Sequence, residues 1–107
     1  MPAIHFVEQK GNVWKVKDSS DEWESGYWVV GLETAQKLIG GDLYLHSKQS
    51  EPSHFGGTVL GYRVQPEGKV AGRLIFRIRA SARHRGVLAG REGWGNEKKI
   101  VGTKGEA

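Results

Sequence analysis

The chain has 107 residues, which predicts one domain with a single core, and it has no cysteine, which excludes disulfides, thiolate zinc sites and cysteine nucleophiles. The net charge of +4 is uneven: residues 1–72 carry seven basic and nine acidic side chains, a net of −2, whereas residues 73–107 carry nine and three, a net of +6. A basic last third is typical of proteins with a polyanionic partner such as nucleic acid, although it also occurs in proteins without one.

Two strand-like runs open the chain. Residues 4–7 (IHFV) and 13–16 (VWKV) flank Gly11-Asn12, a pair that favours a tight turn, so we expect an N-terminal β-hairpin. The next segment, 18–25 (DSSDEWES), is polar and acidic except for Trp23, which is typical of a loop.

A strand and one short helix are expected after this loop. Residues 27–30 (YWVV) are strand-like. Apolar residues recur at helical spacing over 32–39 (LETAQKLI), and Gly40-Gly41 is the kind of signal that ends a helix. A further strand is expected at 42–46 (DLYLH).

The second half of the chain predicts two more strands. Residues 58–64 (TVLGYRV) and 73–80 (RLIFRIRA) are strand-like, with a turn predicted at 66–69 (PEGK). Residues 73–80 alternate apolar and basic positions, so Arg77 and Arg79 are expected to project from the same face.

The remaining residues, from 81 onward, are Gly-rich and basic, and we expect irregular structure there with a short strand near 99–101. The sequence therefore predicts an α+β fold, a small mixed or antiparallel β-barrel with one short helix and the N-terminal hairpin. We expect a single domain over residues 1–102 and a flexible C-terminal tail over 103–107.

Three stretches carry a resemblance to a known family. They are GYWVV (26–30), GDLYLHS (41–47) and FGGTVLGY (55–62), separated by the helix and by a polar loop. This layout resembles the PUA-like superfamily and is most similar to its EVE and YTH branches, with a likeness that covers about residues 23–80. The resemblance implies a small β-barrel that holds an extruded base, often a methylated one, in an aromatic-walled pocket beside a basic surface.

The resemblance places Trp28 and the loop from His46 to Phe55 where those families have pocket walls and base-edge contacts. Trp23 is added because a tryptophan in an acidic loop is a candidate for an exposed stacking residue. The predicted base pocket has seven residues: Trp23, Trp28, His46, Ser47, Ser53, His54 and Phe55. Alternatively, Trp23 folds back as a lid on the barrel, and the Ser and His side chains satisfy the backbone of an ordinary loop.

The densest basic group predicts a phosphate-binding surface, because guanidinium groups pair with phosphate in a bidentate manner. Its members are Arg73, Arg77, Arg79, Arg83 and Arg85, and His84 lies among them. A solvated basic face is the alternative interpretation. Outside this group, Trp14 is expected in the core, and Trp94 either anchors the last segment or contacts a protein partner.

These observations predict a nucleic-acid-binding module that holds a flipped or single-stranded base, modified or not. Two alternatives stay open: a small protein-interaction or inhibitor module anchored by Trp23 and Trp94, and an enzyme that acts on a nucleotide or small polar ligand through His46 and His54.

No catalytic set, metal site or cofactor is predicted, since the four histidines lack HxH or HExxH spacing and no GxSxG, Walker or dinucleotide glycine pattern occurs. Without a leader-like N-terminus or a run of about 18 apolar residues, the chain is expected to be cytoplasmic and to have no membrane partner.

Overall fold

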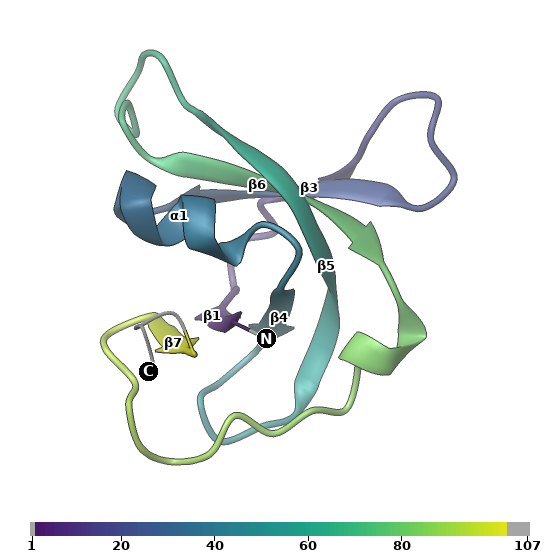
Figure 1. Ribbon diagram of the computed structural model, residues 1–107, viewed down its shortest axis with the longest axis vertical. Coiled ribbons are helices and arrows are strands. Elements are labelled where there is room, and N and C mark those ends of the chain that lie inside the picture. Colours follow the sequence, from purple (N-terminus) through teal and green to yellow (C-terminus); the bar gives the residue numbers. More distant parts are fainter. Residues whose placement is uncertain (1, 103–107) are drawn as a thin grey trace.

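The computed structural model describes residues 2–102, which fold into one sheet, one α-helix and one short 3-10 helix (Figure 1). The sheet has seven strands. In chain order the elements are β1 (Ala3–Val7), β2 (Val13–Lys15), β3 (Glu22–Trp28), α1 (Leu32–Leu38), β4 (Asp42–His46), β5 (Ser53–Val64), β6 (Leu74–Ala80), the 3-10 helix η1 (Ala82–His84) and β7 (Lys98–Val101). The predicted α+β class with one short helix is confirmed. Residues 103–107, which were expected to form a flexible tail, lie outside the described residues.

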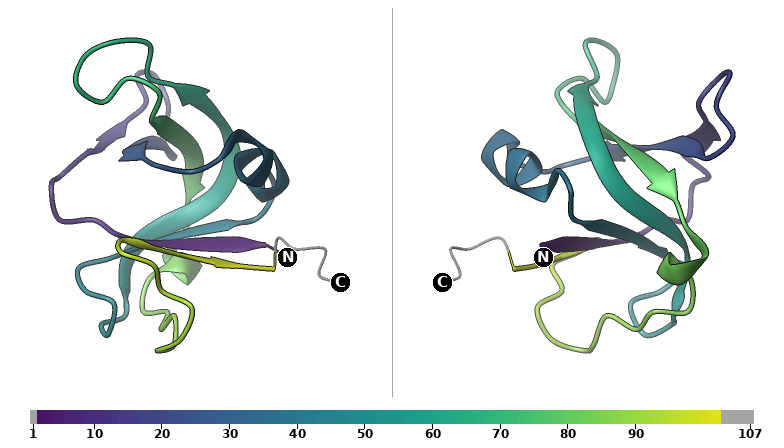
Figure 2. Two further views of the ribbon diagram at one scale, coloured as in Figure 1. Left: turned by 90° about the vertical axis from the view of Figure 1, so that its left-hand side faces the viewer. Right: turned by 45° about the vertical axis from the view of Figure 1, so that its right-hand side comes forward.

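The sheet is mixed, with the strand order β2-β3-β6-β5-β4-β1-β7. Strands β1 and β4 run parallel, and every other neighbouring pair is antiparallel. The strands curve round a common core, but β2 and β7 remain as free edges, so the hydrogen bonds among residues 2–102 do not close the sheet (Figures 1 and 2). The expected closed barrel is therefore corrected to a curved, open sheet.

The predicted N-terminal hairpin is wrong. Strand β1 pairs with β4 and β7, while β2 pairs with β3 at the far edge of the sheet. The physical reason is burial: Ile4, His5 and Phe6 are all buried, so both faces of β1 are covered and the strand takes an interior position with a neighbour on each side. A two-stranded hairpin at the start of the chain would not provide those neighbours.

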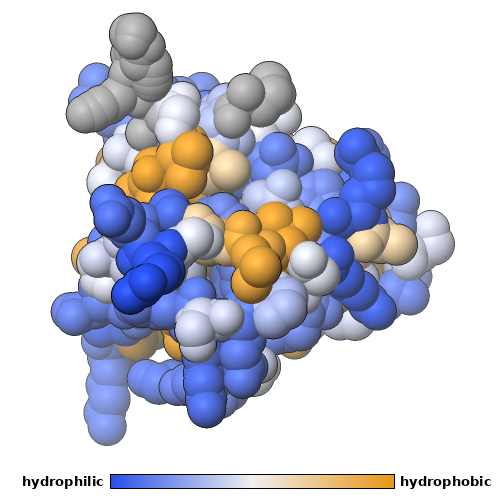
Figure 3. Space-filling model, turned by 90° about the horizontal axis from the view of Figure 1, so that it is seen from below, coloured by the Kyte–Doolittle hydropathy of each residue, from blue (hydrophilic) through white to orange (hydrophobic). Residues whose placement is uncertain are grey.

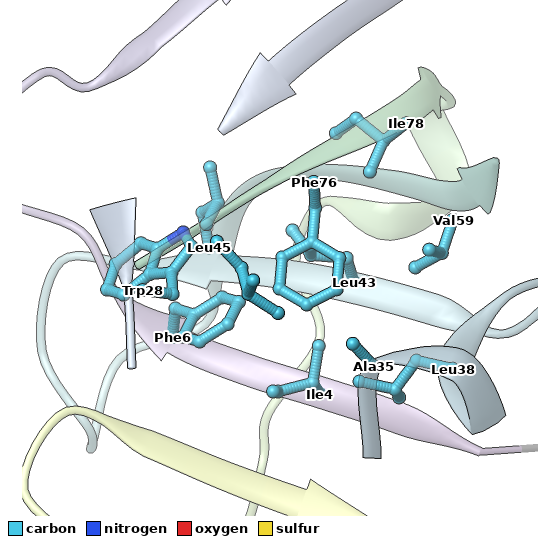
Figure 4. Packing of buried hydrophobic residues seen from close by; sticks show 11 residues of the cluster. Ile4, Phe6, Trp28, Ala35, Leu38, Leu43, Leu45, Val59, Phe76 and Ile78 are labelled. Atoms are coloured by element: carbon cyan, nitrogen blue, oxygen red, sulfur yellow. The ribbon is translucent and has the colours of Figure 1, made fainter. Parts of the chain in front are cut away.

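The core lies on the concave face of the sheet, and α1 covers one end of it (Figure 4). Aromatic packing is close there, since the rings of Phe6 and Trp28 stack with centroids 3.9 Å apart. Helix α1 contributes Ala35 and Leu38, whereas Leu32 is exposed. The helix ends at Leu38, one residue before the predicted end, and the predicted glycine stop follows, with Gly40 at a positive φ of 88°.

Strand β3 begins earlier than expected, because the second half of the predicted acidic loop is strand. Trp23 pairs with Ile78 and faces inward, whereas Glu22 and Glu24 face outward beside arginines of β6 and β5. The acidic residues are thus one face of an alternating strand.

No helix within residues 2–102 is long and apolar enough to cross a membrane.

The glycines at the start of β5 are needed for close strand packing. A Cβ at Gly56 would collide with the backbone oxygen of Leu43, and one at Gly57 would collide with that of Arg79. The neighbouring strands β4 and β6 therefore approach β5 closely at this point.

Candidate functional site

An open hollow of about 780 Å³ lies at the end of the curved sheet where β2 and β3 face the beginning of β5. Four apolar side chains form its inner surface: Val13, Trp23, Leu45 and Phe55. The rim is formed by His54 at the start of β5 and by residues of the connections between strands, which are Glu8, Gln9, Gly11, Ser47, Lys48 and Arg85. We refer to this feature as the aromatic hollow. It combines an apolar interior with a few polar groups, as small-molecule sites do.

The two aromatic walls of the hollow meet nearly at a right angle. The ring centroids of Trp23 and Phe55 are 5.2 Å apart, and their planes are inclined at 72°. Both side chains are half-buried, so part of each ring is open to solvent. A flat ring entering this corner can stack on one wall while it meets the edge of the other, which are the two favoured geometries of aromatic pairs.

Positive charge lies at the rim. The guanidinium carbon of Arg85 is 5.6 Å from the centroid of the Phe55 ring, within the range of a cation–π contact. Lys48, from the β4–β5 connection, lines the same hollow. Two cations beside an apolar corner suit a ligand that has both a flat ring and an anionic group.

Arg85 is held in place by the residues on either side of it. The Ser53 hydroxyl donates to the backbone oxygen of His84 (2.6 Å) and accepts from the backbone N–H of Val87 (3.0 Å). The His84 ring is hydrogen-bonded through Nε2 to the Asp42 carboxylate at 2.8 Å. The segment that carries Arg85 is therefore fastened to β4 and β5.

The β1–β2 connection, residues 8–12, forms the opposite rim. The Glu8 carboxylate accepts from the backbone N–H groups of Lys10 (2.9 Å) and Gly11 (2.7 Å), which fixes the turn. The Gln9 amide donates to the backbone oxygen of Ser47 at 2.8 Å and so joins this rim to the β4–β5 connection. Both rims of the hollow are thus tied by hydrogen bonds.

The seven predicted pocket residues divide into two groups. Four of them line the aromatic hollow together: Trp23, Ser47, His54 and Phe55. The other three, Trp28, His46 and Ser53, are buried. Trp28 packs in the core and donates its indole N–H to Ser25 Oγ at 3.0 Å, while Ser53 positions Arg85 as described above.

His46 lies on the outer face of β4, away from the hollow. Its Nδ1 is 2.8 Å from the backbone oxygen of Glu51 and its Nε2 is 2.8 Å from Nδ1 of His5. Because a carbonyl only accepts, His46 donates from Nδ1 and accepts at Nε2 from His5. Trp94 packs against both imidazoles in T-shaped contacts, with ring centroids 6.2 Å from that of His5 and 5.7 Å from that of His46, which agrees with the anchoring alternative for this residue.

Burial lowers the pKa values of both histidines in this pair. The pKa of His5 falls to about 4, because burial, His46 and Lys99 all disfavour the charged imidazole. The pKa of His46 is also lowered by burial, although its hydrogen bond to Glu51 opposes this effect. The pair therefore consists of two neutral rings near neutral pH, and its structural use leaves neither ring nitrogen of His46 free for a ligand.

The five predicted phosphate-binding arginines occupy different surroundings. Arg77 and Arg79 lie on the outer face of β6 and pair with acidic residues: Arg77 Nη2 is 2.6 Å from Glu22 Oε1, and Arg79 lies 3.6–3.7 Å from Glu22 and Asp21. These carboxylates offset the charge of the strand arginines.

The other three arginines are not in this cluster of ion pairs. Arg85 lines the aromatic hollow, Arg83 is exposed on η1, and Arg73 lines a second, smaller hollow between β1 and β3.

Among residues 2–102, no group of three or more His, Cys, Asp or Glu side chains is arranged to hold a metal ion.

Sequence reasoning missed six residues of the hollow: Glu8, Gln9, Gly11, Val13, Leu45 and Lys48. Val13 and Leu45 were assigned to strands without a direction, and only the pairing of their strands shows that they face the hollow. Lys48 carried a usable signal, since it is the single cation of the polar loop between β4 and β5.

Comparisons with protein-family models, curated proteins and solved structures gave no match to this chain.

Proposed function

We propose that this protein binds nucleic acid and holds one flipped or single-stranded base in the aromatic hollow. The observation that carries the proposal is the corner formed by Trp23 and Phe55, with Arg85 and Lys48 at its rim. A base stacked on an aromatic side chain gains about 1–3 kcal/mol, and the neighbouring cations suit the phosphate attached to it. The volume of about 780 Å³ lies within the usual range for ligand sites.

The finer assignment to a PUA-like fold is part of this proposal. It is supported by the order of elements from β3 through α1 and β4 to the glycine-bearing strand β5, which is the layout on which the resemblance was based. The open edges of the sheet, β2 and β7, depart from a closed barrel. Recognition of a methylated base is the family-based extension of the proposal, and the hollow contains no complete aromatic cage among its lining residues in the range 2–102.

The charge distribution predicts a modest dependence of binding on salt. Arg77 and Arg79 are neutralised by Glu22 and Asp21, so the cations available at the hollow are Arg85 and Lys48. Two phosphate contacts correspond to a slope of about −1.4 in log affinity against log salt for a single strand, at about 0.7 per contact.

The test is a titration of labelled single-stranded oligonucleotides, followed by fluorescence anisotropy at several salt concentrations. Trp23→Leu keeps apolar bulk but removes the stacking surface, and we expect it to weaken binding about tenfold or more. The matched control is Trp14→Phe, since Trp14, contrary to the expectation of a core position, is half-buried on the outer face of β2 and donates its indole N–H to Glu24.

Arg85→Gln completes this series, because it should reduce the salt slope by about 0.7. Equal losses in the two tryptophan variants, or oligonucleotide binding that no variant of the hollow changes, would refute the proposal.

A protein-interaction role is the second candidate, and one observation favours it. Leu88 is 67% exposed and, together with Trp94, lines a further hollow of about 520 Å³ next to the β4–β5 connection. The face that includes the segment after η1 shows hydrophobic patches framed by hydrophilic residues (Figure 3). Under this alternative, Leu88→Ser would abolish capture of a partner protein and leave oligonucleotide binding unchanged.

The enzyme alternative through His46 and His54 has less support. His54 lines the aromatic hollow, but His46 is buried on the other face of β4 with both ring nitrogens engaged. The two imidazoles therefore do not present a joint catalytic pair to a ligand in the hollow.

A further inference from the structure

A second hollow, of about 310 Å³, lies between the end of β1 and the end of β3, two strands that do not pair with each other. We refer to it as the slot. Its walls come from the end of β1, from Gly26, Tyr27 and Trp28 of β3, and from the segments around Arg73 and Asn96. Trp28 and Arg73, two residues predicted for the binding site, line the slot and not the aromatic hollow.

The slot is polar but balanced in charge. Lys10 and Arg73 supply two cations, and Glu8 and Glu97 supply two anions. Asn12 and Asn96 add amides that both donate and accept. A neutral set of donors and acceptors suits the edge of a base and the hydroxyls of a sugar better than it suits an isolated phosphate.

Several of these side chains are free to bind a ligand. Within residues 2–102, the side chains of Asn12, Arg73 and Asn96 make no hydrogen bond or ion pair to another described residue. Asn96 is exposed, and Asn12 and Arg73 are half-buried. Their polar groups are therefore available at the slot without breaking an internal contact.

The slot and the aromatic hollow share one wall. Glu8 and Gln9 line both of them, so the β1–β2 connection separates the two hollows. A single segment of backbone is about 5 Å across. The wall is also fixed by backbone hydrogen bonds. The N–H of Glu8 donates to the backbone oxygen of His46 (2.8 Å), and the N–H of Gly26 donates to the backbone oxygen of Asn12 (3.0 Å).

We infer that the slot binds the nucleoside adjacent to the one in the aromatic hollow, so that the ligand is a single strand of at least two nucleotides. This inference rests on the proposed function. The phosphodiester between the two nucleosides crosses the shared wall at Lys10, the one cation of segment 8–12. The second sugar and base meet the amides of Asn12 and Asn96 beside Arg73.

The test compares two probes of equal charge. One is a nucleoside with a methyl phosphodiester at its 3′ or 5′ oxygen, and the other is a dinucleoside monophosphate, which differs by the second nucleoside; each is made with all four bases. We expect the dinucleoside to bind about tenfold more tightly or better, which is about 1.4 kcal/mol. Arg73→Ala and Asn96→Ala should remove that gain and leave the affinity for the shorter probe within about twofold.

A charge-matched control and a spectroscopic readout complete the design. Lys17→Ala removes an exposed cation of the β2–β3 turn and should change neither affinity. In NMR spectra, the Trp23 indole signal should shift with both probes and the Trp28 signal with the dinucleoside alone.

The outcomes separate the inference from the proposed function. If the shorter probe binds and the dinucleoside gains nothing, or if the slot variants weaken both probes equally, the inference is overturned and the proposed function stands. If neither probe nor longer oligonucleotides bind, both are overturned.

Discussion

Acidification should destabilise this protein through His5, a buried histidine of strand β1. His5 is 6% exposed, stacks on Tyr44 with ring centroids 4.6 Å apart, and donates from Nδ1 to His46. Its pKa in the folded protein is lowered to about 4, whereas the unfolded chain has the ordinary value of 6.5. Between these values the unfolded state binds the proton and the folded state does not, so the free energy of unfolding falls as the pH falls.

The size of the effect follows from the two pKa values. A tenfold change in proton affinity is worth about 1.4 kcal/mol, so His5 contributes about 3 kcal/mol that is present above pH 6.5 and lost progressively towards pH 4. His46 adds to the loss, because burial lowers its pKa as well. The pKa of Glu24 is lowered by its hydrogen bond to Arg63, so this carboxylate affects the free energy of unfolding only below about pH 4.5. The pH range from about 4.5 to 6.5 therefore reports on the histidines and not on Glu24.

The assay is urea unfolding followed by tryptophan fluorescence at pH values from 7.5 to about 4.5. His5→Asn keeps an N–H donor towards His46 but does not titrate, so it should lower stability at neutral pH and flatten its dependence on pH. His54→Asn, which removes an exposed imidazole, is the matched control. Parallel curves for wild type and His5→Asn across this window would show that the buried imidazole is not the origin of the acid sensitivity.

Three further predictions test other contacts. Ser53→Ala removes two hydrogen bonds that position Arg85, so urea unfolding should show a loss of about 1–3 kcal/mol, and oligonucleotide binding should weaken as well. Arg77→Ala breaks an exposed ion pair with Glu22 and should change the unfolding free energy by less than about 1 kcal/mol; a larger loss would contradict its description as a surface pair. Gly57→Ala forces a Cβ against the backbone of β6 and should lower the free energy of unfolding by about 1–3 kcal/mol, which is measured as a lower thermal midpoint. An unchanged midpoint would disprove the close approach of the two strands.

Local patterns predicted the elements better than their pairing. The alternation in β6 and the apolar spacing and glycine stop of α1 are local signals, and both elements formed where expected. The hairpin failed because the partners of β1 are β4 and β7, and Ile4 pairs with Leu43 and Ile100, far away in the sequence. No local feature of the first 16 residues encodes those contacts.

The same limit applies to the acidic stretch before Tyr27. Glu22 and Glu24 are strand residues because β3 pairs with β2 and β6, and their side chains then meet Arg77 and Arg63, which are 55 and 39 positions away. Read alone, the stretch has the composition of a loop. Once β3 is paired, the inward direction of Trp23 follows from the alternation of side chains along the strand.

The candidate site was predictable in its residue types but not in its layout. Four of the seven aromatic and polar residues predicted for the pocket line the hollow, yet the sequence does not show on which face of the sheet a strand residue lies. Trp28 and His46 were predicted for the pocket because of their chemistry, but both are buried outside the aromatic hollow, Trp28 in the core beside the slot and His46 on the other face of β4. A strand-borne aromatic residue is ambiguous until the register of its neighbours is known.

The pairing of β1 with β7 brings Ala3 opposite Val101, so the first and last strands of the described chain lie side by side (Figure 2). A short peptide joining these strands would be compatible with every strand pairing, and the chain could then be opened instead at the exposed turn around Ser20. Such a circular permutant would keep both hollows intact. Because the first and last described strands are neighbours, the domain is also suited to insertion into a surface loop of a host protein.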